Sequence, residues 1–236
     1  MTMLDRPPHA RPSFGRTPAV RGLDLFDTPP VALGPLFEHE PLLAGVTTVA
    51  EPFCGMGRLV LAMRERGLTV FASDVRDRGC PGATVLDFRA MTERPPGCDV
   101  LISNPAYRGA AGSAMDFIEH ALALEFRCVV LLLKLSFLCT QERFERLHRP
   151  GHLRRVHVLA ERLQDMHDAN YTGEKAGQNQ VHAWFVFDRN IAARPRSTRY
   201  RSISRRRACH GPHSCWRHVI TATVITAYAA PRAATS

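Results

Sequence analysis

The sequence contains no long apolar stretch, and its lysines are almost entirely replaced by arginine. The apolar run at 129–133 ends at Lys134, and no other run approaches the roughly 20 residues that a membrane-spanning helix needs. The first residues carry charges with no apolar core behind them, so no signal peptide is expected. With 45% hydrophobic and 22% charged residues in 236, the composition is typical of a soluble globular domain.

Closely spaced cysteine pairs are also missing. Seven cysteines are present, but none lies within two to four residues of another, as zinc fingers and ribbons require. The eleven histidines are scattered. We therefore expect no metal site, and we expect reduced thiols in a cytoplasmic protein.

Acidic residues are absent from residues 191–236, which hold nine arginines. The formal charge of the chain is +9, and nine minus nine leaves residues 1–190 neutral. We expect residues 1–22 to form a flexible leader, 23–190 to form the folded domain and 191–236 to form a disordered basic tail. The tail is either an extension with incidental charge or a nonspecific tether for nucleic-acid phosphates.

The pattern between residues 46 and 187 alternates apolar strands with amphipathic helices. Such alternation predicts the α/β class, with a doubly wound and mostly parallel sheet, in which ligands bind beyond the carboxyl ends of the strands. The expected strands are 46–53, 68–73, 83–86, 99–103, 128–133 and 181–187, and the expected helices are 58–66, 113–126 and 140–147.

A glycine-containing loop follows the first strand, with the sequence Glu51-Pro52-Phe53-Cys54-Gly55-Met56-Gly57. Its two glycines allow a tight turn and a close approach of the backbone to a ligand. A dinucleotide-binding loop requires a third glycine where Val60 stands, and no GK[ST] signature of a P-loop occurs. The loop therefore predicts a ligand site of another kind.

Two polar segments end later strands at the same edge of the sheet. Asp74 ends the second strand, where a carboxylate can accept hydrogen bonds from both hydroxyls of a ribose. Asn104-Pro105-Ala106-Tyr107 follows the fourth, and the Asn104 oxygen and the Pro105 carbonyl can both accept hydrogen bonds from one amino group. Tyr107 offers a ring on which a base can stack. The alternative interpretations are a turn or cap for Asp74 and a simple Asn-Pro turn.

Taken in order, these motifs resemble class I S-adenosylmethionine-dependent methyltransferases. The motifs are Glu51-Pro52-x-x-Gly55-x-Gly57, Ser73-Asp74, Asp87-Phe88 and Asn104-Pro105-x-Tyr107. The last is similar to the (Asp/Asn/Ser)-Pro-Pro-(Tyr/Phe) motif of the amino-methylating branch. The segments at 26–30 and 182–187 are similar to segments of phage and prophage DNA N6-adenine methyltransferases, and the resemblance covers about residues 23–189.

The resemblance implies a Rossmann-like methyltransferase sheet with an antiparallel C-terminal strand, S-adenosylmethionine as cofactor and DNA as partner. The implied cofactor-binding residues are Thr28, Pro29, Glu51, Cys54, Gly55, Gly57, Asp74, Val75, Asp87 and Phe88. The implied catalytic residues, which hold the target amino group and its base, are Asn104, Pro105 and Tyr107. The oligomeric state is not implied.

One position departs from the family pattern, because Ala106 stands where a second proline is expected. The carbonyl remains, but the loop loses rigidity. Three functions stay open: an N6-adenine DNA methyltransferase, a methyltransferase for RNA bases or protein glutamine, and a nucleic-acid-binding protein that has lost its chemistry. His182 and Trp184 share one face of the last strand, where such side chains mostly form core.

Overall fold

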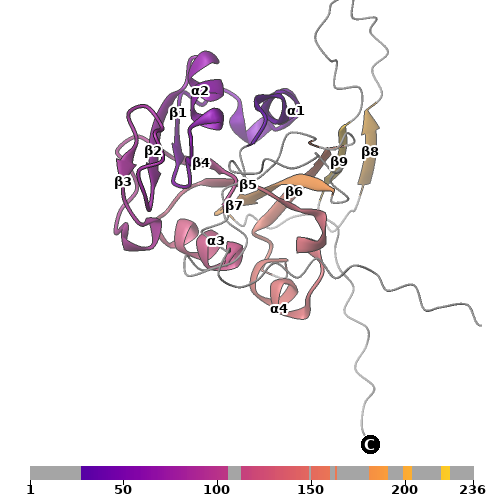
Figure 1. The fold of residues 1–236 in the computed structure, drawn as a ribbon. Coiled ribbons are helices and arrows are strands. Elements are labelled where there is room, and N and C mark those ends of the chain that lie inside the picture. The colour runs from indigo at the N-terminus through magenta and orange to yellow at the C-terminus, as the bar shows by residue number, and fades with distance from the viewer. Residues whose placement is uncertain are drawn as a thin grey trace, which may run out of the picture.

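The computed structural model describes residues 28–105, 113–148, 150–159, 163, 181–190, 199–203 and 219–223. Its strands are β1 (Thr48–Glu51), β2 (Thr69–Asp74), β3 (Thr84–Val85), β4 (Val100–Ser103), β5 (Cys128–Lys134), β6 (Leu153–Leu159), β7 (His182–Asp188), β8 (Arg199–Ile203) and β9 (Val219–Thr223). They form one sheet in the order β3-β2-β1-β4-β5-β7-β6-β9-β8 (Figure 1).

Among the described residues, helices and short turns lie before β1 and in several of the connections between strands. They are α1 (Leu33–His39), α2 (Arg58–Glu65), α3 (Ala114–Ala123) and α4 (Gln141–Arg143), with shorter turns η2 (Pro30–Ala32), η3 (Pro41–Leu43), η4 (Phe88–Ala90), η5 (Leu135–Leu138) and η6 (Phe144–His148). Thr140 caps α4 by accepting a hydrogen bond from the Arg143 backbone N–H. Within the described ranges, no helix has the length and hydropathy needed to cross a membrane.

The strand directions confirm the predicted fold class. Strand β1 runs parallel to β2 and β4, and the pairs β2–β3 and β4–β5 are also parallel. Strand β7 is antiparallel to both β5 and β6. Strands β1 to β7 thus form a Rossmann-like, mostly parallel sheet with an antiparallel C-terminal strand. The strand order reverses between β1 and β4, which is the point where such sheets bind ligands.

Strand β5 is buried on both faces, as its uninterrupted apolar run predicts. Cys128, Val130 and Leu132 belong to the core cluster that includes residues of α1 and α2. The alternate residues of the strand belong to the cluster that includes α3. Figure 1 shows α1 and α2 on one side of the sheet and α3 and α4 on the other. The two helical layers hold the strand ends in fixed positions.

The sequence pattern did not predict α1, whose first turn contains Gly34 and Pro35. Its position follows from burial, because Leu33 and Leu36 are fully enclosed in the core. Trp184 is also fully buried, and its indole Nε1 donates to the Ala32 carbonyl at 2.8 Å. Trp184 is therefore a core residue that joins β7 to the segment entering α1.

A buried ion pair between Glu40 and Arg155 joins the segment after α1 to β6. Glu40, 3% exposed, accepts from Arg155 Nε at 2.8 Å, from Arg155 Nη2 at 2.6 Å and from His157 Nε2 at 2.9 Å. The Leu42 backbone N–H also donates to Glu40, at 2.8 Å. This cluster joins positions more than a hundred residues apart.

Strands β8 and β9 lie in the segment for which the sequence predicted no strand, and that prediction is wrong for residues 199–203 and 219–223. Strand β9 pairs antiparallel with β6, and β8 pairs antiparallel with β9. The domain limits 1–22, 23–190 and 191–236 remain predictions, and the leader lies outside the described residues.

Candidate active site at the carboxyl ends of the strands

The loop after β1 turns back on itself through two glycines. Gly55 has φ 54° and Gly57 has φ 92°, both in the left-handed region that favours glycine. A Cβ added at Gly57 would lie 2.7 Å from the Cys80 sulfur, so only glycine fits against that side chain. Burial, and next the Cys80 thiol, raise the pKa of the buried Cys54 thiol. Cys54 therefore stays protonated and is a packing residue in this state.

The structure brings Asp74 against this loop. Its Oδ2 accepts from the Gly55 N–H at 3.0 Å, while the Cys54 N–H donates to the Ser73 carbonyl at 3.0 Å. Its Oδ1 accepts from the Arg76 N–H at 3.2 Å and from Arg78 Nε at 3.4 Å. Arg78 is a neighbour that the sequence did not predict, and a ligand hydroxyl at Asp74 would share the carboxylate with it.

Glu51 stands at the end of β1 and is fully buried. Its Oε1 accepts from Ser103 Oγ at 2.6 Å and from the Phe53 N–H at 3.2 Å. Its Oε2, also buried, has no hydrogen-bond partner among the described residues. Burial raises the pKa of Glu51 to about 8, against the lowering effect of the Ser103 and Phe53 hydrogen bonds. The strand ends at the switch point thus enclose a carboxyl group that is mostly protonated at neutral pH.

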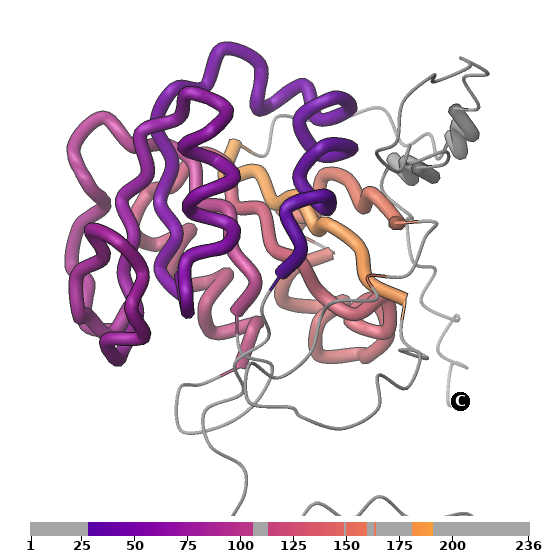
Figure 2. Tube along the Cα trace, turned by 45° about the horizontal axis from the view of Figure 1, so that its top comes forward, coloured from indigo at the N-terminus to yellow at the C-terminus, as the bar shows by residue number. Residues whose placement is uncertain are grey.

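Asn104 follows β4 and contacts the first described residue of the chain. Its Nδ2 donates to Thr28 Oγ1 at 2.8 Å, and Thr28 is 3% exposed. Pro29 and Pro105 are buried beside these two residues in sequence. Figure 2 shows the indigo start of the described chain reaching the strand ends near the magenta segment. Ala106 and Tyr107 lie outside the described residues.

Three further predicted residues are Asp87, Phe88 and Val75, and among them Phe88 packs against Phe53 of the glycine loop. Asp87 caps η4 and pairs with Arg89, whose Nη2 lies 2.6 Å from Asp87 Oδ2 and holds the pKa of Asp87 below its ordinary value. Phe88 is buried, with its ring centroid 5.5 Å from that of Phe53. Val75, next to Asp74, is 40% exposed. The roles of these residues toward a cofactor remain predictions.

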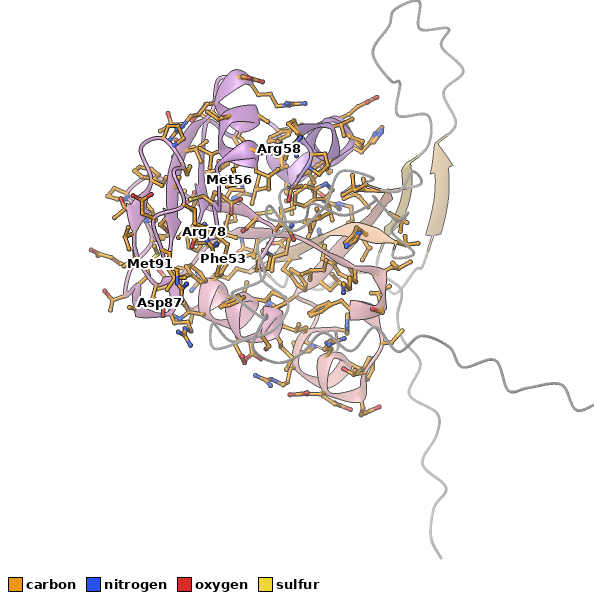
Figure 3. The ribbon with its side chains drawn as sticks, viewed as in Figure 1. Phe53, Met56, Arg58, Arg78, Asp87 and Met91 are labelled. Carbon is orange, nitrogen blue, oxygen red and sulfur yellow. The ribbon has the colours of Figure 1, made fainter. Side chains whose placement is uncertain are left out.

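The exposed part of this edge can be followed in Figure 3. Arg58 and Met56 lie at the start of α2, Arg78 and Phe53 lie below them in the view, and Asp87 lies further down. Met56 is 48% exposed although it is apolar.

A separate cavity of about 210 Å³ lies over β2 and β3. It is lined by Ala50, Pro52, Val70, Phe71, Ala72, Ser73, Gly82, Thr84, Leu86, Phe88, Met91 and Pro95. Among the described residues, the connection from β3 to β4 contains only the turn η4 and no α-helix, which leaves Phe71 41% exposed. Phe88 is shared with the predicted site, but neither Asp74 nor Asn104 lines this cavity, so it does not coincide with the edge that these two residues occupy.

Comparison with known proteins gives neighbours in structure only. No protein-family model and no curated protein matches the sequence. A Pyrococcus horikoshii protein assigned as an RNA methyltransferase has a TM-score of 0.49 and 18% identity, over 70% of this chain and 88% of that one. A Listeria monocytogenes protein assigned as a class I S-adenosylmethionine-dependent methyltransferase has a TM-score of 0.45 and 12% identity, over 71% and 60%.

A third neighbour is the magnesium protoporphyrin IX methyltransferase of Synechocystis PCC 6803, solved with bound S-adenosylmethionine. Its TM-score is 0.42 and its identity is 13%, over 66% of this chain and 74% of that one. All three identities lie below 25% and all three TM-scores below 0.5. The chemistry of this chain is therefore inferred from its own residues.

Proposed function

We propose that the chain is an S-adenosylmethionine-dependent methyltransferase that acts on an amino nitrogen, most specifically N6 of adenine in DNA. The observation that carries this proposal is the arrangement at the switch point of the sheet. There the glycine loop is hydrogen-bonded to Asp74, and Glu51 is hydrogen-bonded to the residue that precedes Asn104. A cofactor loop and an acceptor loop thus share one hydrogen-bonded edge.

The residues present fit the cofactor in two respects. Gly55 and Gly57 hold left-handed backbone conformations with no side chain, which lets the loop turn tightly and lets its backbone approach a ligand. Glu51 Oε2 is a buried carboxyl oxygen with no partner among the described residues, and once the carboxyl group ionises it can accept a hydrogen bond from a ligand. Asp74 would bind the ribose hydroxyls. The other proposed cofactor-binding residues are Pro29, Cys54, Gly55, Val75, Asp87 and Phe88. Thr28, which the resemblance also assigns to the cofactor, contacts Asn104 in the structure.

When bound, S-adenosylmethionine supplies an electrophilic methyl group on a sulfonium centre. The protein's own contribution is to hold the acceptor. Asn104 Oδ1 and the Pro105 carbonyl would accept hydrogen bonds from the target amino group, orient its nitrogen and stabilise the positive charge that develops on it. In duplex DNA the adenine must first leave the stack, and the Tyr107 ring would hold it.

The proposal is tested by methyl transfer to defined acceptors. Purified chain is incubated with S-adenosylmethionine labelled in the methyl group and with separate pools of DNA, RNA and protein. We expect label in DNA, as N6-methyladenine after hydrolysis. Label found only in RNA or only in protein glutamine would show that this molecule, and not DNA, is the methyl acceptor. Absence of label from all three pools would favour a nucleic-acid-binding protein that has lost methyltransferase activity.

The raised pKa of Glu51 predicts that cofactor binding releases protons. Glu51 is mostly protonated at pH 7 because its pKa is about 8, and a ligand donor facing Oε2 favours the carboxylate. Calorimetric titration in two buffers of different ionisation enthalpy is expected to show more proton release for the wild type than for Glu51→Gln, which cannot ionise. Equal release from both chains would remove Glu51 from the cofactor site.

The same group makes the stability of the free chain depend on pH. Because the pKa of Glu51 is raised on folding, its contribution is fully present below the ordinary value of 4.5 and is lost as pH rises through about 8. The Glu51→Gln control should therefore flatten the decline in the free energy of unfolding over that range.

A further inference from the structure

The hydrogen bond between Thr28 and Asn104 joins two segments that lie 76 residues apart in the sequence. Thr28 precedes η2 and α1 on one side, and Asn104 begins the loop after β4 on the other. The Asn104 Nδ2 to Thr28 Oγ1 distance is 2.8 Å, and Thr28 is 3% exposed. Asn104 is half-buried, so this hydrogen bond is partly shielded from water and restrains the orientation of its side chain.

The direction of this hydrogen bond matters for an acceptor-binding amide. A carboxamide is planar, with its NH2 donor at one end and its oxygen acceptor at the other. With the NH2 end of Asn104 donating to Thr28, the oxygen end is turned away from Thr28. An amide oxygen that receives a target amino group must keep this orientation, because rotation by 180° about the last side-chain bond would present two donors to another donor.

We propose that Thr28 is a positioning residue for methyl transfer, acting through Asn104. This inference rests on the proposed function. It differs from the role that the family resemblance implies for Thr28, which is cofactor binding. The two roles predict different kinetics: a positioning residue affects kcat, whereas a cofactor-binding residue affects cofactor affinity.

The test compares Thr28→Val, which removes the hydroxyl at constant shape, with Thr28→Ser, which retains it. We expect Thr28→Val to lower kcat about three- to tenfold, the effect of one neutral hydrogen bond. Thr28→Ser should restore most of the rate, and the cofactor Kd should stay within about twofold in both. Thr48→Val is the matched control, because Thr48 lies at the amino end of β1, away from the strand-end edge that holds Glu51. This variant should retain the parental rate.

A double variant separates action through Asn104 from a general effect on the site. In the Asn104→Ala background, Thr28→Val is expected to cause no further loss of rate. An additive loss, or a loss of cofactor affinity with kcat unchanged, would overturn the proposal. So would failure of Thr28→Ser to recover the rate.

A measurement without turnover keeps this inference distinct from the proposed function. Side-chain amide resonances of asparagine labelled with ¹⁵N report the Asn104 NH2 group directly. We expect slower hydrogen exchange at Asn104 in the wild type than in Thr28→Val, with Asn190 unchanged as an exposed reference. Equal exchange rates of the Asn104 NH2 group in the wild type and in Thr28→Val would show that the Thr28–Asn104 hydrogen bond is not formed, and would overturn the proposal. Protected exchange with no methyl transfer by the wild type would instead overturn the proposed function, and with it the catalytic role of the contact.

Discussion

Asn104→Ala is expected to lower kcat for methyl transfer at least about hundredfold. Loss of a group that stabilises charge in the transition state typically has this effect. The cofactor Kd should stay within about twofold, because the proposed ribose-binding carboxylate, Asp74, is held in place by Gly55, Arg76 and Arg78. The measurements are methyl transfer to DNA at saturating substrate and calorimetric titration with the cofactor.

Asn190→Ala provides the control, because Asn190 is exposed and follows β7 far along the chain. It should retain the parental rate. If Asn104→Ala instead methylated DNA at the parental rate, Asn104 would not contact the target amino group, and the acceptor site would have to be placed elsewhere on the strand-end edge.

The second large effect concerns stability and lies away from the site. Glu40→Gln is expected to lower the free energy of unfolding by about 3 kcal/mol, since it leaves the Arg155 guanidinium without its carboxylate and alters the hydrogen bond with His157. Burial alone would raise the pKa of Glu40, but the hydrogen bonds from Arg155, His157 and Leu42 lower it to about 2.

The lowered pKa fixes the direction of the acid effect. Because the pKa of Glu40 falls on folding, its stabilising contribution is present above the ordinary value of 4.5 and is lost as pH falls through about 2. Urea unfolding across that range should therefore show a steeper acid loss for the wild type than for Glu40→Gln. Glu38→Gln, with its side chain 65% exposed, is the matched control and should follow the wild type. Parallel curves for wild type and Glu40→Gln would show that the ion pair does not carry this acid dependence.

The central sheet could be predicted because its strands have local signatures. Strand β5 reads as a continuous apolar run, and β2 and β4 end at polar residues where a loop begins. Helix α1 could not be predicted this way, since Gly34 and Pro35 interrupt its pattern and its burial depends on β7. Strand β9 pairs with its neighbour β8 and also with the distant β6, and no pattern within the segment indicates the pairing with β6.

The candidate site likewise contains residues that the sequence could predict and contacts that it could not. The glycine loop, Asp74 and Asn104 could be found because parallel strands bring their carboxyl ends to one edge. The Thr28–Asn104 and Glu51–Ser103 hydrogen bonds join residues 76 and 52 positions apart, and periodicity within a segment carries no information about such pairs. The pairing of Asp87 with Arg89 shows the opposite case, in which a near neighbour already binds a carboxylate that the motif assigned to the cofactor.

The close packing of Gly57 against Cys80 also sets the order in which substitutions can accumulate. A side chain at position 57 would contact the Cys80 sulfur. The residue would also have to adopt φ 92°, which strains most residues other than glycine. A smaller residue at position 80 removes the contact with the sulfur but leaves the backbone strain at position 57, whereas position 80 can shrink while Gly57 stays. Libraries that randomise both positions together should recover the few residues that tolerate this φ, such as asparagine, only alongside glycine or alanine at 80, a dependence that scanning each position alone would miss.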